Sequence, residues 1–121
     1  MTDYRVLITG SRNWTDEKKI ERAIQIATLG RSKSRTVIVH GAAKGADRIA
    51  GAIAEGMGLH VEAYPADWDT HGRAAGPIRN QQMVDLGADI CLAFPLGESR
   101  GTRHCMKAAE KAGIEVINYG D

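Results

Sequence analysis

Five short runs of β-branched and apolar residues alternate along this chain with segments of helical periodicity, and no other feature constrains the fold as much. The runs are Tyr4–Thr9, Thr36–His40, His60–Tyr64, Ile90–Phe94 and Ile114–Asn118. Strands that alternate with helices pair in parallel, and a parallel sheet needs helices on both faces. The sequence therefore predicts an α/β fold with three layers, built on a five-stranded parallel sheet.

Four segments between these runs have the spacing of amphipathic helices. In the first, Ile20 begins an i, i+3, i+4, i+7 pattern of apolar residues that follows two N-cap candidates, Thr15 and Asp16. The other helices are expected over residues 46–57, 77–87 and 99–112, the last of them with Ser99 as its N-cap. Residues 65–76 show no period and are predicted to form a long irregular loop, which in a compact domain is often functional.

The apolar content of the strands predicts their order in the sheet. The first and fourth strands are the most apolar and are expected at the centre, whereas His60–Tyr64 alternates polar with apolar residues and is expected at an edge. The order 3-2-1-4-5 satisfies both conditions. In that order the winding reverses between strands one and four, and this reversal leaves a ligand crevice above their carboxyl ends.

The length and composition indicate one domain over residues 1–121, because 121 residues of which 43% are hydrophobic form a single core. No apolar run approaches the ~20 residues that span a bilayer, and the N-terminus lacks an apolar signal segment. Cys91 and Cys105 show no spacing of a disulfide framework. We therefore expect a cytoplasmic protein with no membrane partner.

The balance of charge and aromatic residues argues against nucleic acid as a partner. The net charge is only +1, and aromatic residues make up 5% of the chain, whereas a nucleic-acid binder is usually strongly basic or carries a stacking platform. The four histidines lack metal-ligand spacing, so no metal site and no cofactor are expected. No Ser/His/Asp pattern indicates a nucleophile, and the catalytic residues, if any, are unassigned.

Three loops that follow strands one, two and four combine glycine with a cation. Glycine lets backbone approach a ligand, and the free N–H groups of helix N-termini attract anions. One such loop is weak support, because tight turns between strand and helix contain glycine anyway. Three loops that converge at the predicted crevice favour a bound phosphate. Their candidate ligand-binding residues are Gly10, Ser11 and Arg12, then Gly41, Lys44, Gly45 and Asp47, then Gly97, Ser99, Arg100, Gly101 and Thr102.

The third helix adds two candidates, Arg79 and Asn80. Arg79 shares a face with Met83 and Leu86, so its guanidinium either covers the sheet edge or points into the crevice, and the irregular stretch before it favours the crevice. Asp47 either caps the second helix or holds a ribose hydroxyl, and capping is the commoner role of an aspartate in such a place.

Other residues of these loops also have two interpretations. Trp14 and Trp68 either stack on a base or seal the core. The chain lacks the GxGxxG fingerprint, and Lys44 is followed by Gly45 where a P-loop would have Ser or Thr after its lysine. ATP hydrolysis of the P-loop type is therefore disfavoured.

Four segments together resemble the SLOG superfamily, and in particular its small YspA-like branch from bacteria and phages. The segments are residues 10–12, 41–47, 75–80 and 97–102, and the resemblance covers essentially the whole chain. It implies a Rossmann-like fold that binds a nucleotide or a nucleotide-derived ligand at the motif loops. It also implies a homo-oligomer, since oligomers are common in the superfamily.

Two activities within the superfamily serve as alternatives. The Lonely Guy phosphoribohydrolases cleave the N-glycosidic bond of nucleotides, and their loop carries a glutamate that this chain lacks after Thr102. Glu98 or Asp47 would have to replace it. DprA binds single-stranded DNA, which the charge disfavours here. The combination of an anion site and a missing acid favours a sensor or sequestering protein, with the phosphoribohydrolase-like enzyme as the alternative.

Overall fold

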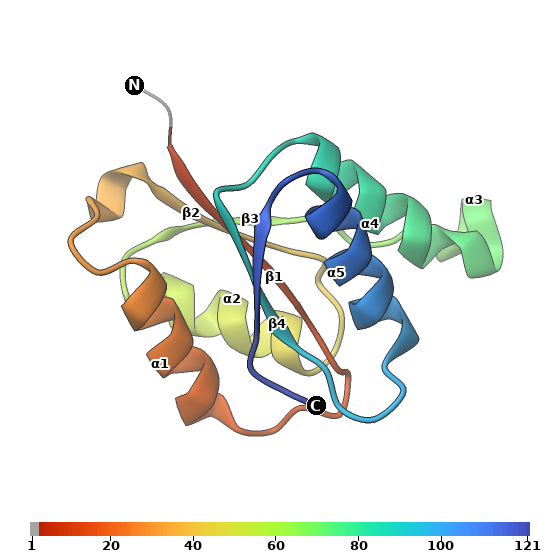
Figure 1. Ribbon diagram of the computed structural model, residues 1–121, viewed down its shortest axis with the longest axis horizontal. Coiled ribbons are helices and arrows are strands. Elements are labelled where there is room, and N and C mark those ends of the chain that lie inside the picture. The colour runs from red at the N-terminus through yellow and green to blue at the C-terminus, as the bar shows by residue number, and fades with distance from the viewer. Residues whose placement is uncertain (1–2) are drawn as a thin grey trace.

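The computed structural model describes residues 3–121 and shows helices packed on both faces of one sheet (Figure 1). The elements are β1 (Tyr4–Gly10), α1 (Glu17–Ala27), η1 (Lys33–Arg35), β2 (Thr36–His40), α2 (Ala46–Gly56), β3 (His60–Ala63), α3 (Trp68–His71), η2 (Gly72–Ala74), α4 (Ala75–Asp85), β4 (Ile90–Phe94), α5 (Arg100–Lys111) and β5 (Glu115–Asn118). No helix in this part of the chain has the length and apolar character needed to cross a membrane.

The sheet has the order β3-β2-β1-β4-β5, and every neighbouring pair is parallel. Both the predicted fold and the predicted strand order are therefore confirmed. β2 and β4 are buried along their whole length, as expected for strands covered on both faces. β3 lies at an edge as predicted, and it ends one residue early, although the N–H of Tyr64 still donates to the carbonyl of His40 (2.9 Å).

Two hydrophobic clusters lie on opposite faces of the sheet. Side chains of α1 and α2 pack with Val6 and Ile8 on one face, and side chains of α4 and α5 pack with Leu7 and Cys91 on the other. The alternation of Val6, Leu7 and Ile8 between the clusters follows from the two-residue period of a strand. Cys91 and Cys105 are buried free thiols, and burial raises the pKa of Cys105 to about 11.

The prediction of a long irregular loop over residues 65–76 is wrong. This segment contains α3, η2 and the first turn of α4, which begins at Ala75, two residues before Pro77. The Asp67 side chain starts α3 by accepting a hydrogen bond from the N–H of Thr70 (3.1 Å). Four residues are too few to show a helical period. Proline is accepted in the first turn of α4 because N–H groups there have no partner within the helix.

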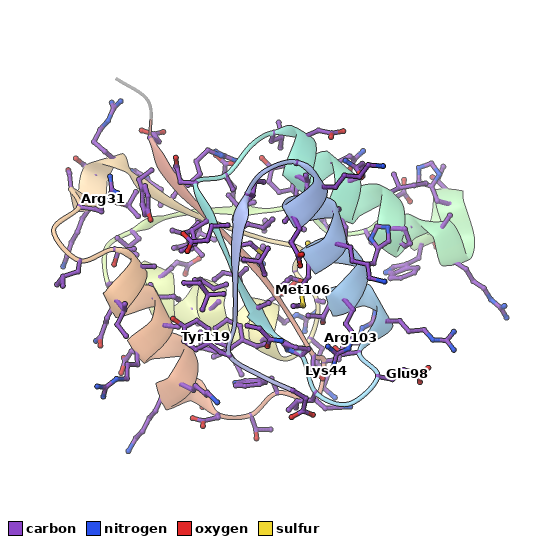
Figure 2. The ribbon with its side chains drawn as sticks, in the orientation of Figure 1. Arg31, Lys44, Glu98, Arg103, Met106 and Tyr119 are labelled. Carbon is purple, nitrogen blue, oxygen red and sulfur yellow. The ribbon has the colours of Figure 1, made fainter. Side chains whose placement is uncertain are left out.

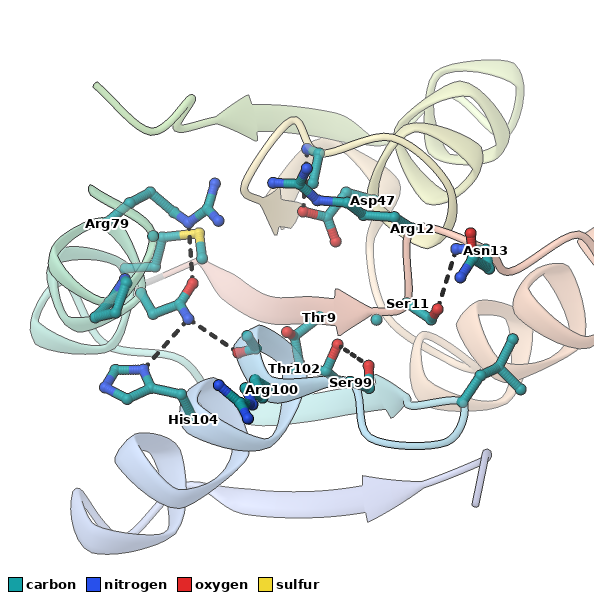
Figure 3. Close-up of a pocket in the computed structure, with 18 of the residues that line it drawn as sticks. Thr9, Ser11, Arg12, Asn13, Asp47, Arg79, Ser99, Arg100, Thr102 and His104 are labelled. Atoms are coloured by element: carbon teal, nitrogen blue, oxygen red, sulfur yellow. Dashed lines mark hydrogen bonds between the residues drawn. The ribbon is translucent and has the colours of Figure 1, made fainter. Parts of the chain in front are cut away.

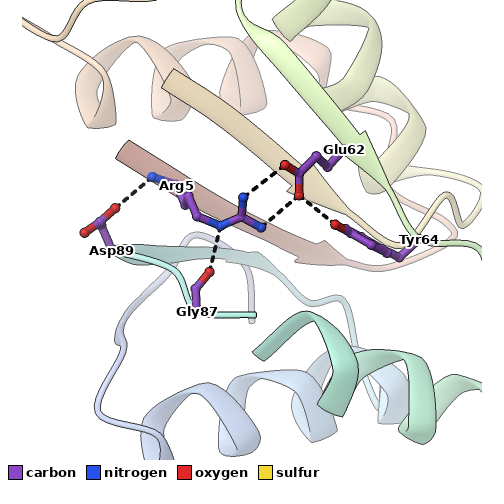
Figure 4. A network of polar contacts seen from close by, with 5 residues as sticks. All are labelled: Arg5, Glu62, Tyr64, Gly87 and Asp89. Carbon is purple, nitrogen blue, oxygen red and sulfur yellow. Dashed lines mark hydrogen bonds and ion pairs between the residues drawn. The ribbon is translucent and has the colours of Figure 1, made fainter. Parts of the chain in front are cut away.

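Arg5 joins three parts of the sheet through its backbone and its guanidinium (Figure 4). Nη1 and Nη2 donate to the two carboxylate oxygens of Glu62 on β3 (3.0 and 2.9 Å), and Nε donates to the carbonyl of Gly87 (2.9 Å). The Tyr64 hydroxyl also donates to Glu62 (2.7 Å). The hydrogen bond from Arg5, with the one from Tyr64 second, lowers the pKa of Glu62. This network therefore links the edge strand β3 to β1 across the intervening strand β2.

We expect Glu62→Gln to reduce the free energy of unfolding at pH 7 by about 1 kcal/mol. The ion pair with Arg5 is bidentate, which strengthens it, but the Glu62 side chain is 38% exposed, so water weakens the interaction. A lowered folded pKa stabilises the protein above the unfolded pKa, and that contribution disappears as the pH falls through the folded value. Urea denaturation at pH 7 and at acidic pH measures the change, with Glu115→Gln on β5 as the control. A difference between wild type and Glu62→Gln that stays constant into acid would contradict this assignment.

Candidate functional site

The carboxyl ends of β1 and β4 open into a pocket of about 640 Å³, a size typical of small-molecule sites (Figure 3). It lies at the point where the winding of the sheet reverses, between the loops that follow these strands and the N-terminal parts of α4 and α5. The lining residues are Thr9, Gly10, Ser11, Arg12, Asn13, Ala43, Asp47, Trp68, Arg73, Gly76, Pro77, Arg79, Asn80, Met83, Leu96, Ser99, Arg100, Gly101, Thr102 and His104.

The structure brings ten of the fourteen candidate residues to this pocket. They are Gly10, Ser11, Arg12, Asp47, Arg79, Asn80, Ser99, Arg100, Gly101 and Thr102. The other four, Gly41, Lys44, Gly45 and Gly97, do not line it. Three of these four belong to the loop after β2, which reaches the pocket lining through Ala43 instead, so the ligand contacts predicted for Gly41, Lys44 and Gly45 stay predictions.

The glycines of the loop after β2 serve close contacts within the protein. Gly45 has φ of +86°, and a Cβ at this position would collide with the carbonyl oxygen of Ser11. That same oxygen accepts a hydrogen bond from the N–H of Ala46 (3.1 Å), which starts α2. A Cβ on Gly41 would collide with the guanidinium of Arg79, and Lys44 is exposed. This loop is therefore packed by its neighbours, and Lys44 does not line the pocket.

The N-terminus of α5 borders the pocket without a side-chain cap. Ser99 occupies the N-cap position as predicted, but its backbone is left-handed (φ +41°), and its hydroxyl bonds to the hydroxyl of Thr102 (2.9 Å). The prediction that Ser99 caps the helix with its side chain is therefore wrong. The first N–H groups of a helix have no partner within it, and they carry the positive end of its dipole. This terminus is thus suited to an anion.

Asn80 and Arg79 hold the walls of the pocket together. The buried Asn80 amide donates to the carbonyl of Gly101 (3.1 Å), which joins α4 to the first turn of α5. The Nε of Arg79 donates to the Asn80 side-chain oxygen (2.9 Å), and its Nη1 donates to the carbonyls of Gly41 and Tyr64. Arg79 therefore links α4 to the ends of β2 and β3. Its Nη2 has no partner among residues 3–121.

The charged groups around the pocket are mostly positive. Among the described residues, four arginines line it, against the single carboxylate of Asp47. They are Arg12, Arg73, Arg79 and Arg100. Charges of one sign that surround a concave site raise the local concentration of ligands of the opposite sign. The pocket therefore favours an anionic ligand even though the whole chain is nearly neutral.

The two tryptophans have different roles. Trp14 is buried, packs edge-on against Phe94 with ring centroids 5.2 Å apart, and donates from its indole N–H to the carbonyl of Asp16 (2.8 Å). Trp68 is 48% exposed at the pocket wall, and the guanidinium of Arg12 lies 5.7 Å from its ring centroid. Of the two interpretations, the core position therefore applies to Trp14, whereas Trp68 lies at the pocket wall, and its stacking on a base stays a prediction.

Asp47 does not cap α2, contrary to the commoner role of such a residue, because Gly45 is the N-cap. Its Oδ2 accepts hydrogen bonds from the N–H groups of Gly41 (3.0 Å) and Ala43 (3.3 Å). Desolvation raises the pKa of Asp47 to about 6, although both hydrogen bonds and the charges of Arg79 and Arg12 oppose the rise. Since the folded pKa exceeds the unfolded one, this group makes the free energy of unfolding fall as the pH rises from about 4 to about 6.

Comparison with known proteins places the chain in a family. The model of the YspA, cpYpsA-related SLOG family, YAcAr, matches residues 4–71, which is more than half of the chain. The chain belongs to the YAcAr family. The Gene 61 protein of Mycobacterium phage D29 is 54% identical to it over 122 residues, and the match covers 97% of both chains. The resemblance stated from the sequence motifs is therefore confirmed.

Two solved structures share the fold of this YAcAr chain. DNA processing protein A (DprA) from Streptococcus pneumoniae superposes with a TM-score of 0.77 and 21% identity, and the match covers 96% of this chain but 50% of that one. DprA from Helicobacter pylori, described for its single-stranded DNA binding mode, gives a TM-score of 0.69 and 16% identity over 97% of this chain and 65% of its own. The YAcAr chain thus spans between half and two thirds of these proteins, and the likeness shows the fold.

The YAcAr chain has one carboxylate among the described residues of the pocket lining. Glu98, the other candidate replacement for the glutamate of the Lonely Guy enzymes, is exposed, does not line the pocket, and pairs with Arg100 (3.0 Å) on the outside of its loop (Figure 2). Within residues 3–121, no group of His, Cys, Asp or Glu side chains could hold a metal ion. Any acid–base chemistry at this site by a carboxylate would therefore use Asp47.

Several lining residues were not among the candidates, and only some carry a signal in the sequence. His104 lies about one helical turn after Gly101, so the period of α5 predicts that both face the same side, and its Nδ1 lies 3.3 Å from the Asn80 amide. Arg73 and Pro77 reach the pocket because η2 and α4 follow α3 directly. Met83 lies one helical turn after Arg79, so the period of α4 places it on the same face, whereas Thr9, Asn13, Ala43, Gly76 and Leu96 have no such signal.

Proposed function

We propose that this protein binds a nucleotide or a nucleotide-derived ligand, with a phosphate of the ligand at the N-terminus of α5. The observation that carries the proposal is the uncapped first turn of α5 beside a pocket lined by four arginines. Backbone N–H groups at a helix N-terminus together with arginine form the usual protein site for phosphate. Membership of a SLOG family supports a nucleotide as the source of that phosphate.

The other parts of the pocket suit the rest of a nucleotide. The half-exposed ring of Trp68 offers a face on which a base can stack, and Arg12 beside it adds a cation. Met83 and Leu96 supply apolar surface. The volume of about 640 Å³ accommodates a mononucleotide. The protein would then act as a sensor or a sequestering protein for such a ligand.

We expect at least one of the four common nucleoside 5′-monophosphates to bind about tenfold or more tightly than its nucleoside, because only the monophosphate makes charge-assisted hydrogen bonds to α5 and the arginines. Isothermal titration calorimetry of the eight compounds measures this difference. Equal affinity of nucleoside and monophosphate, or no binding of either, would contradict the proposal.

Two further outcomes would point to the alternatives. Release of free base at catalytic turnover from nucleoside monophosphates, NAD or ADP-ribose would indicate a phosphoribohydrolase-like enzyme with Asp47 as its carboxylate. Retention of a single-stranded oligonucleotide with a steep dependence on salt would indicate DNA binding like that described for the Helicobacter pylori protein. Either result would replace the sensor or sequestering role.

A further inference from the structure

Asp47 is a buried carboxylate of which only one oxygen is satisfied. The residue is 5% exposed, and its Oδ2 accepts from two backbone N–H groups of the loop after β2. Its Oδ1 is buried and has no hydrogen-bond partner among the described residues. A carboxylate oxygen out of water without a donor is destabilising, and most buried polar atoms of native proteins have a partner. Oδ1 is therefore an acceptor without a donor in the structure.

The neighbouring cations do not supply that donor. Arg12 and Arg79 favour the charged form of Asp47 through their charges, yet the hydrogen bonds of Arg79 go to Gly41, Tyr64 and Asn80. Asp47 itself lines the pocket. A molecule in the pocket that carries a hydrogen-bond donor would therefore satisfy Oδ1, and the nearby positive charges would keep the acceptor ionised.

The place of Asp47 relative to the anion site indicates which part of a ligand it meets. Asp47 follows β2, and Ser99 and Thr102 follow β4, so the two groups flank the end of β1 from opposite sides (Figure 3). Strands are about 4.8 Å apart, so β2 and β4 lie roughly 10 Å from each other. A ligand with its phosphate beside Ser99 and Thr102 can therefore extend across the end of β1 toward Asp47.

In a nucleoside 5′-monophosphate, the group next to the phosphate is the sugar, and its donors are the 2′ and 3′ hydroxyls. We propose that Asp47 accepts hydrogen bonds from the ribose hydroxyls of the bound nucleotide, so that the pocket selects ligands with an intact ribose. This inference rests on the proposed nucleotide-binding function and goes beyond it, because it names the part of the ligand that the protein recognises and the residue that recognises it.

A ligand without these hydroxyls would leave Oδ1 buried and without a donor, which is the situation in which binding sites discriminate most strongly. We expect each monophosphate that binds to exceed its 2′,3′-dideoxy counterpart in affinity by about tenfold or more. Titration calorimetry of the wild-type protein with these pairs needs no substitution, so the test does not depend on a variant that folds.

The variant Asp47→Asn assigns the effect to this residue. The asparagine oxygen can still accept from Gly41 and Ala43, but an amide NH₂ replaces the ionised acceptor that faces the pocket. The preference for ribose should therefore fall to about threefold or less. Asp85→Asn, at the exposed end of α4, is the matched control and should keep the wild-type preference. Thermal unfolding of both variants verifies that they are folded.

The outcomes separate the two proposals. If the wild type binds monophosphates but does not distinguish them from the dideoxy compounds, the nucleotide site stands and the role of Asp47 is overturned. If the preference survives in a folded Asp47→Asn variant, ribose is recognised elsewhere and the assignment to Asp47 is overturned. If no monophosphate binds at all, the proposed function fails and this inference fails with it.

Discussion

Substituting alanine for Gly45 is expected to reduce the free energy of unfolding by about 3 kcal/mol, the largest effect on stability that we anticipate. The backbone at Gly45 has φ of +86° and ψ of −127°, a region that is accessible almost only to glycine. The added Cβ would also collide with the carbonyl of Ser11, which accepts the hydrogen bond that begins α2. Urea denaturation followed by circular dichroism measures the loss.

Gly30→Ala is the matched control for this prediction. Gly30 also has a positive φ (+76°), but a Cβ there would meet no atom within 4 Å. It should therefore show only the backbone strain of about 1 kcal/mol. Similar losses for both variants would mean that the close packing of Gly45 against the loop after β1 contributes nothing. A larger loss at Gly45 is the expected result, and it would combine the strain of its unusual backbone angles with the collision of the added Cβ.

Replacement of Arg79 by alanine is expected to weaken the binding of a nucleoside monophosphate by about 1.5–3 kcal/mol, the contribution of a charge-assisted hydrogen bond. The guanidinium lines the pocket with Nη2 unpaired within the described residues, while its other nitrogens are fixed by carbonyls of Gly41 and Tyr64 and by Asn80. The variant removes a positive charge from the site and also releases these contacts. Titration calorimetry with the tightest-binding monophosphate gives the difference.

The control for the charge itself is Arg48→Ala. Arg48 lies on α2 close to the same loop and donates to the carbonyl of Ala42, but it is exposed and does not line the pocket. Its removal changes the net charge equally, so the affinity should stay within about twofold of wild type if only local contacts matter. An equal loss of affinity in the two variants would show that Arg79 does not bind the ligand directly. If Arg79→Ala does not fold, Arg79→Lys is measured in its place.

The strands and their order could be predicted because burial in a parallel sheet leaves a direct record in the sequence. Ile90–Phe94 is apolar throughout, since both of its faces are covered, and the bounds of that strand and of Thr36–His40 agree with the structure. The edge position of β3 follows in the same way from its polar residues. Such patterns depend only on whether each face of a strand is buried or exposed to water. That rule applies to all parallel sheets covered by helices.

The details of the candidate site depend on interactions that no periodicity reports. Lys44 does not line the pocket, and the neighbouring Gly45 has a positive φ where the loop approaches Ser11. Nothing in the spacing of this loop specifies that turn. Ser99 occupies the N-cap position, but its hydroxyl bonds to Thr102 and makes no capping hydrogen bond to the backbone of the first turn. Asp47 likewise accepts hydrogen bonds from the backbone of the preceding loop instead of capping α2. Short polar side chains have several partners within reach, and tertiary packing chooses among them.

Residues 65–76 show a different limit. The four residues of α3 depend on a single capping interaction from Asp67, and α4 starts before its proline. Elements as short as α3 contain too few positions for an apolar stripe. This segment nevertheless brings Trp68, Arg73 and Gly76 to the pocket, so the part of the chain with the weakest pattern contributes three of its lining residues.

The half-satisfied carboxylate of Asp47 has a consequence for how the sequence can change over time. Most proteins lie just above the stability that they need, and substitutions that relieve a local cost are easy to find. A neutral residue at position 47 would relieve such a cost in the empty protein. Selection for stability and selection for ligand binding would therefore act on this one side chain in opposite directions. The aspartate would persist only where ligand binding is under the stronger selection.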